Sequence, residues 1–516
     1  MSIQPRNGTP ISLAVLLEGE NVAPYRETPI ASCGDDASEA FRDGLFVCRE
    51  SDENAALDAI TTAAANGAVA AVVAKGDWEA KLTTALEKSG VATEDGAFQV
   101  VFVDDPRSVW ARTCQAFQDF PARKLKTIAV TGTAGKTSAS YIIGGMLAEA
   151  GRSVGLIGSL GVYDGKKLAP LSETTPEPAA LAELLARMVD NGCSCAIIEA
   201  SSVALAERRL DGIEFDAVCL TNLRRDHLDY HRTVDQYRRV KMRIFDYLKK
   251  DAIAICNVDD RVTDAALHLI NCPTLTIGIQ PTECAVAGRP VERQRGEQTF
   301  YIVAGTDGAP VRSRIVGKEH IYNCLTAAAL GVAWNIDLKT IARGVERVEY
   351  IPGRMEQIDC GQPFGVYLDC ASSPESLTET IETLRSVAGT GSIYCVLSAP
   401  NDSDRSKRPL MGRAAESTAD VVVVTRGNLP KTQAQAQEAL DDLLHGFKEP
   451  EKAGVIADRK DAIVWALSQA GPEDVVLVVG HDVSTLDDVD ESFVADRQFI
   501  RHWLYENQPC LEQYWY

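Results

Sequence analysis

Short apolar runs alternate with stretches of helical periodicity along most of the chain. Runs such as Ala68–Ala74 and Val421–Val424 are continuously apolar, which is typical of parallel strands buried on both faces. Between such runs, apolar residues recur at helical spacing, as leucine and methionine do across residues 181–188. Residues 274–315 are richer in short β runs and turns, which predicts a small antiparallel patch. The overall alternation predicts an α/β fold with mostly parallel sheets.

Breaks in this pattern divide the chain into three predicted domains. Pro121 and the basic residues 123–126 form the first predicted linker, and Tyr350–Gly353 forms the second. The predicted domains are residues 1–122, a small N-terminal α/β domain; residues 123–350, a central P-loop ATPase-type domain with a mostly parallel sheet; and residues 351–516, a C-terminal Rossmann-like doubly wound domain.

Composition and charge restrict the function. The 516 residues carry a formal net charge of -21, which disfavours nucleic acid and anionic membranes as partners, so an anionic ligand needs a local site. The polar segment Met1–Pro10 lacks a signal-peptide core, and no apolar run is long enough to span a bilayer. The 14 cysteines are scattered without a Cys-x-x-Cys pair, so neither a disulfide framework nor a zinc site is indicated. We therefore expect a cytoplasmic protein that binds no nucleic acid and is not inserted into a membrane.

The stretch Thr131–Ser138 (TGTAGKTS) is the first candidate site. It follows the apolar residues 127–130 and opens a helical pattern, so backbone N–H groups and the positive end of a helix dipole would face an anion. Lys136 is predicted to reach the β- and γ-phosphates, and the Thr137 hydroxyl to hold Mg²⁺. The first glycine of the common P-loop would fall at Val130, so an ordinary strand–helix turn is the alternative. The flanking strand and helix favour the nucleotide site.

Polar groups also stand where predicted strands end. Glu199 closes an apolar run, and Asp226 and His227 follow the run Asp216–Leu220 within a few residues. Ligands of open α/β sheets bind at such ends, and a carboxylate with an imidazole near a phosphate cradle suits a second divalent cation. Alternatively, Glu199 caps a helix or pairs with an arginine such as Arg224 or Arg225.

Lys241 occupies an unusual helix position. Thr233 and Gln236 have the spacing of a capping box, which predicts the start of a helix running toward Lys250. Lys241 falls within the apolar arc of that helix, where a cation is costly unless it is paired, titrated or modified. Two interpretations remain open. The side chain extends out of the apolar stripe to water, or CO₂ carbamylates the amine and makes it a metal-binding carboxylate.

Six stretches, taken in order, resemble the Mur ligases, and most closely the MurE type, which adds the third amino acid to UDP-N-acetylmuramoyl-L-alanyl-D-glutamate. They are Thr131–Thr137 (TGTAGKT), Ser172–Pro176 (SETTP), Glu199–Leu205 (EASSVAL), Phe215–Tyr230 (FDAVCLTNLRRDHLDY), Lys241–Phe245 (KMRIF) and Pro352–Glu356 (PGRME).

The resemblance implies an ATP-dependent, ADP-forming amide ligase of peptidoglycan precursor synthesis. ATP would phosphorylate the substrate carboxylate, and the amine of an amino acid, meso-diaminopimelate or lysine, would attack the acyl-phosphate. The negative charge in this reaction is spread over acyl and phosphoryl oxygens, and its stabilisation needs preorganised cations in a closed site. The implied ligands are ATP, Mg²⁺, the UDP-muramoyl-dipeptide and the amino acid, with CO₂ for lysine carbamylation, and we expect a monomer.

The resemblance also implies a role for each matching position. The catalytic residues would be Lys136, Glu199, His227, Lys241 and Arg354. The ATP-binding residues would be Gly132, Thr133, Ala134, Gly135, Lys136, Thr137, Ser138, Asn323, Arg354 and Asp369. The Mg²⁺ ligands would be Thr137, Glu199, His227 and Lys241 as its carbamate. The substrate-facing residues would be Asp36, Thr174, Thr175, Ser202, Arg209, Arg408, Asn428 and Asp482.

The chain departs from the family pattern mainly where substrates are read. Asp36–Ser38 (DAS) replaces the Asp-Ser-Arg uridine motif, and residues 370–374 (CASSP) replace Tyr-Ala-His-Thr-Pro. Residues 427–430 (GNLP) replace the amino-acid motif Asp-Asn-Pro-Arg, although Arg408 remains. Residues 480–482 (GHD) shorten Gly-Lys-Gly-His-Glu. Losing one charged partner in a desolvated site costs about 2–5 kcal/mol, so either the third amino acid differs or other residues compensate.

These departures keep other functions open. One is an amide ligase of the same superfamily with another carboxylate acceptor, such as a folylpolyglutamate-synthase-like enzyme. Another is a nucleotide-binding regulatory paralogue without ligation. The intact Glu199, His227 and Lys241 argue against the regulatory paralogue, because a protein that only binds a nucleotide does not need a buried lysine there.

Overall fold

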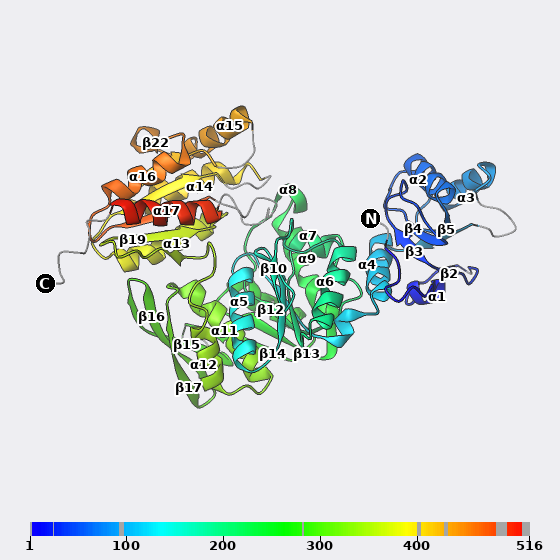
Figure 1. Cartoon of the computed structure of the whole chain (residues 1–516), viewed down its shortest axis with the longest axis horizontal. Helices are drawn as coiled ribbons and strands as arrows, with labels where there is room; N and C mark the ends of the chain where they lie inside the picture. The colour runs from blue at the N-terminus through cyan, green and yellow to red at the C-terminus, as the bar shows by residue number, and fades with distance from the viewer. Residues whose placement is uncertain are drawn as a thin grey trace.

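The computed structural model has three α/β parts arranged along its long axis, with the N-terminal part at one end and the C-terminal part at the other (Figure 1). The predicted three-domain α/β fold is confirmed, whereas the domain boundaries stay predictions. The structure describes residues 3–23, 25–91, 98–280, 283–399, 404–427, 432–480 and 493–507.

The N-terminal part is a small parallel sheet in the order β3-β4-β5-β6. Its strands are β3 (Ser32–Gly34), β4 (Gly44–Val47), β5 (Ala68–Ala74) and β6 (Gln99–Val103), and its helices include α2 (Glu53–Ala65), α3 (Glu79–Lys88) and α4 (Pro106–Phe117). β1 (Ile11–Ser12), α1 (Leu13–Leu16) and β2 (Pro29–Ile30) lie beside them. Alternate residues of β5 enter separate apolar cores, Val72 in one and Val73 in the other, which explains the continuous apolar run.

The middle part contains the longest sheet, in the order β10-β9-β8-β11-β7-β12-β13-β14-β15-β16-β17. The strands from β8 to β15 in this order run parallel, and both ends of the sheet are antiparallel. The strands are β7 (Lys126–Thr131), β8 (Val154–Gly158), β9 (Gly161–Tyr163), β10 (Leu168–Ala169), β11 (Cys195–Glu199), β12 (Phe215–Leu220), β13 (Leu248–Asn257), β14 (Thr274–Gly278), β15 (Val286–Gln294), β16 (Glu297–Ala304) and β17 (Asp307–Ser313). The predicted antiparallel patch corresponds to β15–β17, but it continues the central sheet, and β14 pairs in parallel.

Helices of the middle part connect and cover this sheet. They are α5 (Lys136–Glu149), α6 (Pro178–Asp190), α7 (Ser202–Ala206), α8 (Leu228–His231), α9 (Val234–Met242), α10 (Arg261–Ala266), α11 (Lys318–Ala333) and α12 (Leu338–Glu346). No described helix combines the length and the apolarity needed to cross a membrane.

Helix α9 begins as predicted but ends early. The Thr233 side chain accepts a hydrogen bond from Gln236 N at 3.2 Å. The helix ends at Met242, a 3₁₀ turn covers Arg243–Tyr247, and β13 follows directly. The prediction of a helix toward Lys250 was therefore wrong, because pairing of β13 with β12 overrides the local helical pattern.

The C-terminal part is a second covered sheet, in the order β18-β19-β23-β20-β21-β22, with only β18 antiparallel among these described strands. The strands are β18 (Glu356–Gln357), β19 (Gly365–Asp369), β20 (Ile393–Ser398), β21 (Val421–Thr425), β22 (Gly454–Val455) and β23 (Val475–Val479), and the helices are α13 (Pro374–Ala388), α14 (Lys407–Thr418), α15 (Gln433–Leu444), α16 (Arg459–Gln469) and α17 (Phe493–Asn507). Val476 packs into one core and Leu477 into another, so both faces of the sheet are buried, as the doubly wound prediction requires.

Close packing fixes α5, the helix that opens at the TGTAGKTS stretch. A Cβ atom added to Gly344 on α12 would lie 2.5 Å from Met146 Cα, and one added to Gly145 would lie 2.9 Å from Gly344 O. Only glycines allow α5 and α12 to approach this closely.

Gly344→Ala is therefore expected to lower the free energy of unfolding by up to about 2 kcal/mol. Overpacking costs about 1–3 kcal/mol, which exceeds the gain of about 1 kcal/mol in helix propensity. Urea denaturation followed by circular dichroism measures the change. Gly308→Ala is the matched control, because its Cβ would meet nothing closer than 3.8 Å, and equal losses in both variants would contradict the packing explanation.

Candidate active site

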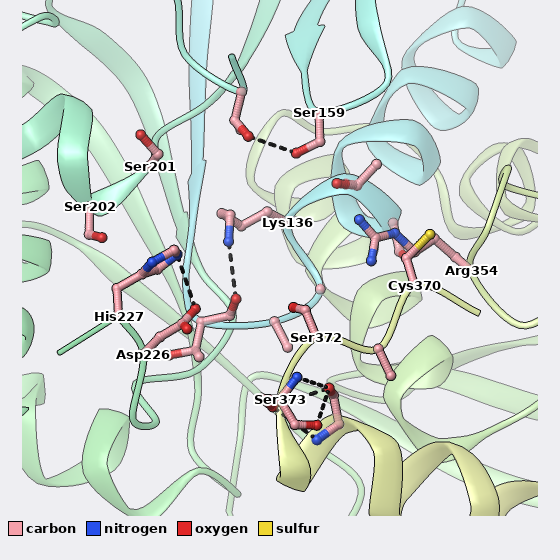
Figure 2. Close-up of a pocket in the computed structure, with 18 of the residues that line it drawn as sticks. Lys136, Ser159, Ser201, Ser202, Asp226, His227, Arg354, Cys370, Ser372 and Ser373 are labelled. Carbon is pink, nitrogen blue, oxygen red and sulfur yellow. Dashed lines mark hydrogen bonds and ion pairs between the residues drawn. The ribbon is translucent and has the colours of Figure 1, made fainter. Parts of the chain in front are cut away.

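A pocket lies between the middle and C-terminal parts, at the ends of β7, β12 and β19. In Figure 2, Lys136 occupies its centre, Arg354 and Cys370 lie on one side, and Ser202, Asp226 and His227 lie on the other. The lining residues are Thr133–Ser138, Ser159, Thr174, Ser201, Ser202, Asp226, His227, Lys241, Arg354, Asp369–Ser373, Ser376 and Lys407.

The turn from β7 to α5, the cradle, depends on glycine at two positions. Gly132 has φ +145° and Gly135 has φ +85°. A Cβ at Gly132 would lie 1.9 Å from Thr221 Oγ1, and one at Gly135 would lie 2.7 Å from Asn323 Oδ1. Val130 is fully buried in β7, so the glycine of the common motif has no role at that position. The turn therefore presents its backbone toward the pocket.

The end of β12 holds this cradle in shape. Ala134 N donates to Asn222 Oδ1 at 3.0 Å, and Asn222 Nδ2 donates back to Ala134 O at 3.1 Å. Thr221 Oγ1 donates to the same carbonyl at 2.6 Å. The cradle is thus fixed by side chains of the neighbouring strand, which is the preorganisation that anion binding requires.

Lys136 lies across the cradle. Its Nζ donates to Gly132 O and Thr133 O, each at 3.0 Å. Burial lowers the pKa of Lys136, and the nearby Asp226 and Glu199 act in the opposite direction. The side chain is therefore positioned by neutral carbonyls that a phosphate oxygen would outcompete.

Glu199 is fully buried at the end of β11. Its carboxylate accepts hydrogen bonds from Thr137 Oγ1 at 2.9 Å and Ser159 Oγ at 3.3 Å. Burial raises the pKa of Glu199, while Lys136 and the Thr137 hydrogen bond lower it. Arg224, which the sequence suggested as a partner of Glu199, instead pairs with Glu379 at 2.7 Å.

Lys241 is buried, with 1% of its surface exposed. The ammonium does not extend to water: its Nζ donates to Thr131 Oγ1 at 3.4 Å and lies 5.3 Å from the centre of the Tyr237 ring. Burial, with a contribution from Lys136, brings the pKa of Lys241 well below its ordinary value. The environment therefore favours the neutral amine, and the interpretation of a side chain extending to water is wrong.

His227 and Asp226 form the opposite wall. His227 Nε2 lies 3.3 Å from Asp226 Oδ2. Burial lowers the pKa of His227 more than Asp226 raises it, so the neutral imidazole that binds metals is favoured.

Arg354 reaches the pocket from a strained turn between the second and third predicted domains. Gly353 before it has φ +64° and Met355 after it has φ +47°, a conformation that costs a non-glycine residue about 1 kcal/mol or more. Met355 N donates to Asp369 Oδ2 at 2.8 Å, and Gly353 N donates to Glu356 Oε2 at 3.0 Å. These contacts hold the guanidinium toward Lys136 (Figure 2).

The residues present fit a hydrated Mg²⁺ ion and a polyphosphate. Thr137 and Glu199 offer adjacent oxygen donors, and the cradle supplies backbone N–H groups. The described residues contain no cluster of three or more His, Cys, Asp or Glu that could hold a metal ion. Ser202 Oγ is buried, lines the pocket and has no hydrogen-bond partner among the described residues, so a polar ligand would satisfy it.

A side cavity continues the pocket along α11. It shares Gly135, Ser138, Arg354 and Asp369 with the pocket and is also lined by Asn323. The structure thus brings together the cradle and the three remaining residues predicted to contact ATP.

The predicted substrate residues are more scattered. Thr174 and Ser202 line the pocket, and Thr175 donates to Glu199 O at 2.7 Å behind it. Arg209 is ion-paired with Glu173, Glu177 and Glu207. Arg408 Nη1 lies 2.9 Å from Asp442 Oδ2, and Asp36 accepts a hydrogen bond from Ser38 Oγ in the N-terminal part. Neither Arg408 nor Asp36 lines the pocket. Asn428 and Asp482 lie outside the described residues.

Sequence reasoning assigned no role to three residues of the site, although it noted Asp226 at the end of a predicted strand. Lys407 lines the pocket, whereas its neighbour Arg408 does not. Lys407 forms an ion pair with Asp226. Asn222 supports the cradle. Asp226 and Asn222 stand at the end of β12, so the strand-end rule offered a signal for them. Nothing local distinguished Lys407 from Arg408.

Comparison with known proteins defines the class. Residues 130–331 match the Mur ligase middle domain, and residues 353–481 match the Mur ligase, glutamate ligase domain. The chain belongs to the Mur ligase family.

Individual relatives carry more specific names than the two family domains. A UDP-N-acetylmuramoyl-L-alanyl-D-glutamate--2,6-diaminopimelate ligase from Geobacillus thermodenitrificans is 36% identical over 388 residues, which cover 74% of this chain and 78% of the relative. The ligase of the same name from Bacillus licheniformis is 31% identical over 497 residues, 93% and 97% of the two chains. A solved structure with this name has a TM-score of 0.65 at 23% identity, covering 96% and 99%. A Mycobacterium tuberculosis folylpolyglutamate synthase with ADP has a TM-score of 0.59 at 18% identity, covering 77% and 95%.

Asn222→Ala is expected to weaken binding of ADP with Mg²⁺ about 10-fold, because two hydrogen bonds that shape the cradle are lost. Isothermal titration calorimetry measures this affinity. Asn191→Ala is the control: Asn191 donates to Asp164 O at 3.0 Å away from the pocket, so its affinity should match that of the unaltered protein. Unchanged affinity in Asn222→Ala would show that the cradle holds its shape without this side chain.

Proposed function

We propose that this protein is an ATP-dependent, ADP-forming amide ligase that adds an amino acid to UDP-N-acetylmuramoyl-L-alanyl-D-glutamate. The convergence of the phosphate cradle, Glu199, His227 and Lys241 opposite Arg354 supports this proposal most directly. The names of relatives 30–36% identical over most of the chain support it independently. The enzyme would act on small molecules as a cytoplasmic monomer, with domains 1–122, 123–350 and 351–516.

Different residues of the pocket would have different roles in forming an acyl-phosphate. Backbone N–H groups of the cradle and Lys136 would hold the β- and γ-phosphates, and Arg354 would neutralise charge on the transferred group. The hydroxyls of Thr174 and Ser202 would orient the acceptor so that its carboxylate oxygen attacks the γ-phosphorus and ADP leaves. Attack of the amine on the acyl carbon then forms the amide and releases phosphate. Location of the pocket between domains would exclude water, which otherwise hydrolyses the intermediate.

The metal ligands in this proposal are Thr137, Glu199, His227 and the carbamate of Lys241. Bound Mg²⁺ would supply Lewis-acid stabilisation of charge on the phosphoryl oxygens. Burial makes the Lys241 amine a nucleophile by disfavouring its charged form. Attack of that amine on CO₂ gives a carbamate and releases one proton, and the new anion offsets the desolvated cations around it.

The amino acid is meso-diaminopimelate or lysine in this proposal. The altered Asp36–Ser38 and Gly427–Pro430 favour, as a second candidate, a ligase that uses another carboxylate acceptor of the folylpolyglutamate-synthase kind.

Phosphate release provides the test. With ATP, Mg²⁺ and UDP-N-acetylmuramoyl-L-alanyl-D-glutamate, we expect release that depends on meso-diaminopimelate or lysine. A panel of other amino acids defines the selectivity, and dihydropteroate-like and polyglutamyl acceptors serve as the alternative arm. Release with those acceptors but not with the muramoyl-dipeptide would select the second candidate. ATP binding without release under any condition would contradict ligation.

Carbamylation of Lys241 is tested with ¹³C-labelled bicarbonate. We expect a carbamate carbon resonance near neutral pH, because the lowered pKa of Lys241 gives a larger fraction of neutral amine than an ordinary lysine has. Lys241→Met should abolish both the resonance and phosphate release, whereas Lys250→Met, at an exposed position on β13, should change neither. Full turnover in Lys241→Met would refute this part of the mechanism.

A further inference from the structure

Ion pairs join the loop after β12 to the C-terminal part. Lys407 Nζ, at the start of α14, lies 2.7 Å from Asp226 Oδ1. Arg224 Nη1, on the same loop, lies 2.7 Å from Glu379 Oε2 on α13. The Lys407 and Asp226 side chains are 9% and 14% exposed, so this pair is largely desolvated.

Lys407 differs from its basic neighbours by facing the pocket. Arg408 pairs with Asp442, and Arg405 pairs with Glu438, both within the C-terminal part. Lys407 instead crosses to the middle part and lines the pocket with Lys136 and His227. The Arg224–Glu379 pair already connects the two parts, so a cation in the pocket is not needed for that connection alone.

The position of Asp226 shows which side of the pocket Lys407 serves. Asp226 and His227 lie across Lys136 from Arg354, on the same side as Ser202 (Figure 2). Arg354 and Lys136 would face the ATP phosphates. Lys407, within ion-pair distance of Asp226, therefore supplies positive charge on the side of Ser202, where the proposed function places the acceptor.

A carboxylate is the group that Lys407 binds now. An acceptor carboxylate, or the acyl-phosphate made from it, offers the same kind of oxygen to the same ammonium. Asp226 would hold the desolvated ammonium in place until that ligand arrives, because a buried cation without a partner is costly.

We propose that Lys407 is a substrate-contacting residue of the ligase, whose ammonium moves from Asp226 to the reacting carboxylate of the acceptor. This inference rests on the proposed function. It assigns acceptor binding in part to the C-terminal domain, through a residue outside the family-matched set of substrate positions given above.

The test compares acceptor affinity with nucleotide affinity by isothermal titration calorimetry. Lys407→Met keeps the length of the side chain and removes the charge. We expect binding of UDP-N-acetylmuramoyl-L-alanyl-D-glutamate to weaken about 10- to 100-fold, as loss of a charge-assisted hydrogen bond predicts, while binding of ADP with Mg²⁺ changes less than about twofold. Lys407→Arg should recover part of the acceptor affinity. In turnover assays, KM for the acceptor should rise while KM for ATP stays constant.

Removing Lys407 also leaves Asp226 unbalanced, and the double variant Lys407→Met/Asp226→Asn separates the two effects. Acceptor affinity at least 10-fold below that of the unaltered enzyme in the double variant would support direct contact. Recovery of full affinity would overturn the inference, since Lys407 would then only neutralise Asp226. Equal weakening of acceptor and nucleotide would also overturn it and indicate a role in connecting the domains.

Controls keep folding and function separate from this inference. Arg405→Met removes an exposed cation near the start of α14 and should leave both affinities unchanged, and thermal unfolding checks that each variant is folded. If the unaltered enzyme does not bind the muramoyl-dipeptide, the proposed function fails and this inference fails with it. If the unaltered enzyme binds it and Lys407→Met binds it equally well, the inference alone is overturned.

Discussion

Concentrated positive charge in a desolvated pocket is the constraint on which this structure depends. Lys136, Arg354 and Lys407 line one pocket, and each comes from a different element. Mutual repulsion and desolvation are costly in such a place. Buried carboxylates offset part of that cost, and anionic ligands would offset the rest. The pocket therefore favours anionic groups such as polyphosphate and carboxylate. The described residues contain no cluster of metal-binding side chains.

The strand order explains how distant residues reach this pocket. β7 lies between β11 and β12, so the cradle, Glu199 and Asn222 emerge at one edge of the sheet although they are far apart in sequence. The linker turn and α14 then bring Arg354 and Lys407 from the opposite side. The middle part supplies a rigid wall, and the C-terminal part supplies the complementary cations. This division follows from parallel topology, in which the carboxyl ends of the strands share an edge.

Local patterns predicted the parts of the site that local chemistry determines. The cradle, the place of Lys241 in the apolar arc of its helix and the position of Glu199 at a strand end were all visible as spacing within a few residues, although the spacing left open whether Lys241 extends to water. The end of α9 was not, because strand pairing of β13 decides it. The choice between Lys407 and Arg408 was equally hidden, since their neighbours in space, Asp226 and Asp442, lie far away in the chain. Sequence patterns therefore located the middle-domain wall well and the contribution of the C-terminal part poorly.

The strained turn around Arg354 stiffens the connection between these parts where it borders the pocket. Gly353 and Met355 have left-handed backbone conformations, and Asp369 and Glu356 tie the turn to the C-terminal sheet. The guanidinium of Arg354 is therefore carried by the C-terminal sheet, although it lies near Lys136 of the middle part (Figure 2). The backbone conformation of three consecutive residues thus sets where the C-terminal part places one of its positive charges.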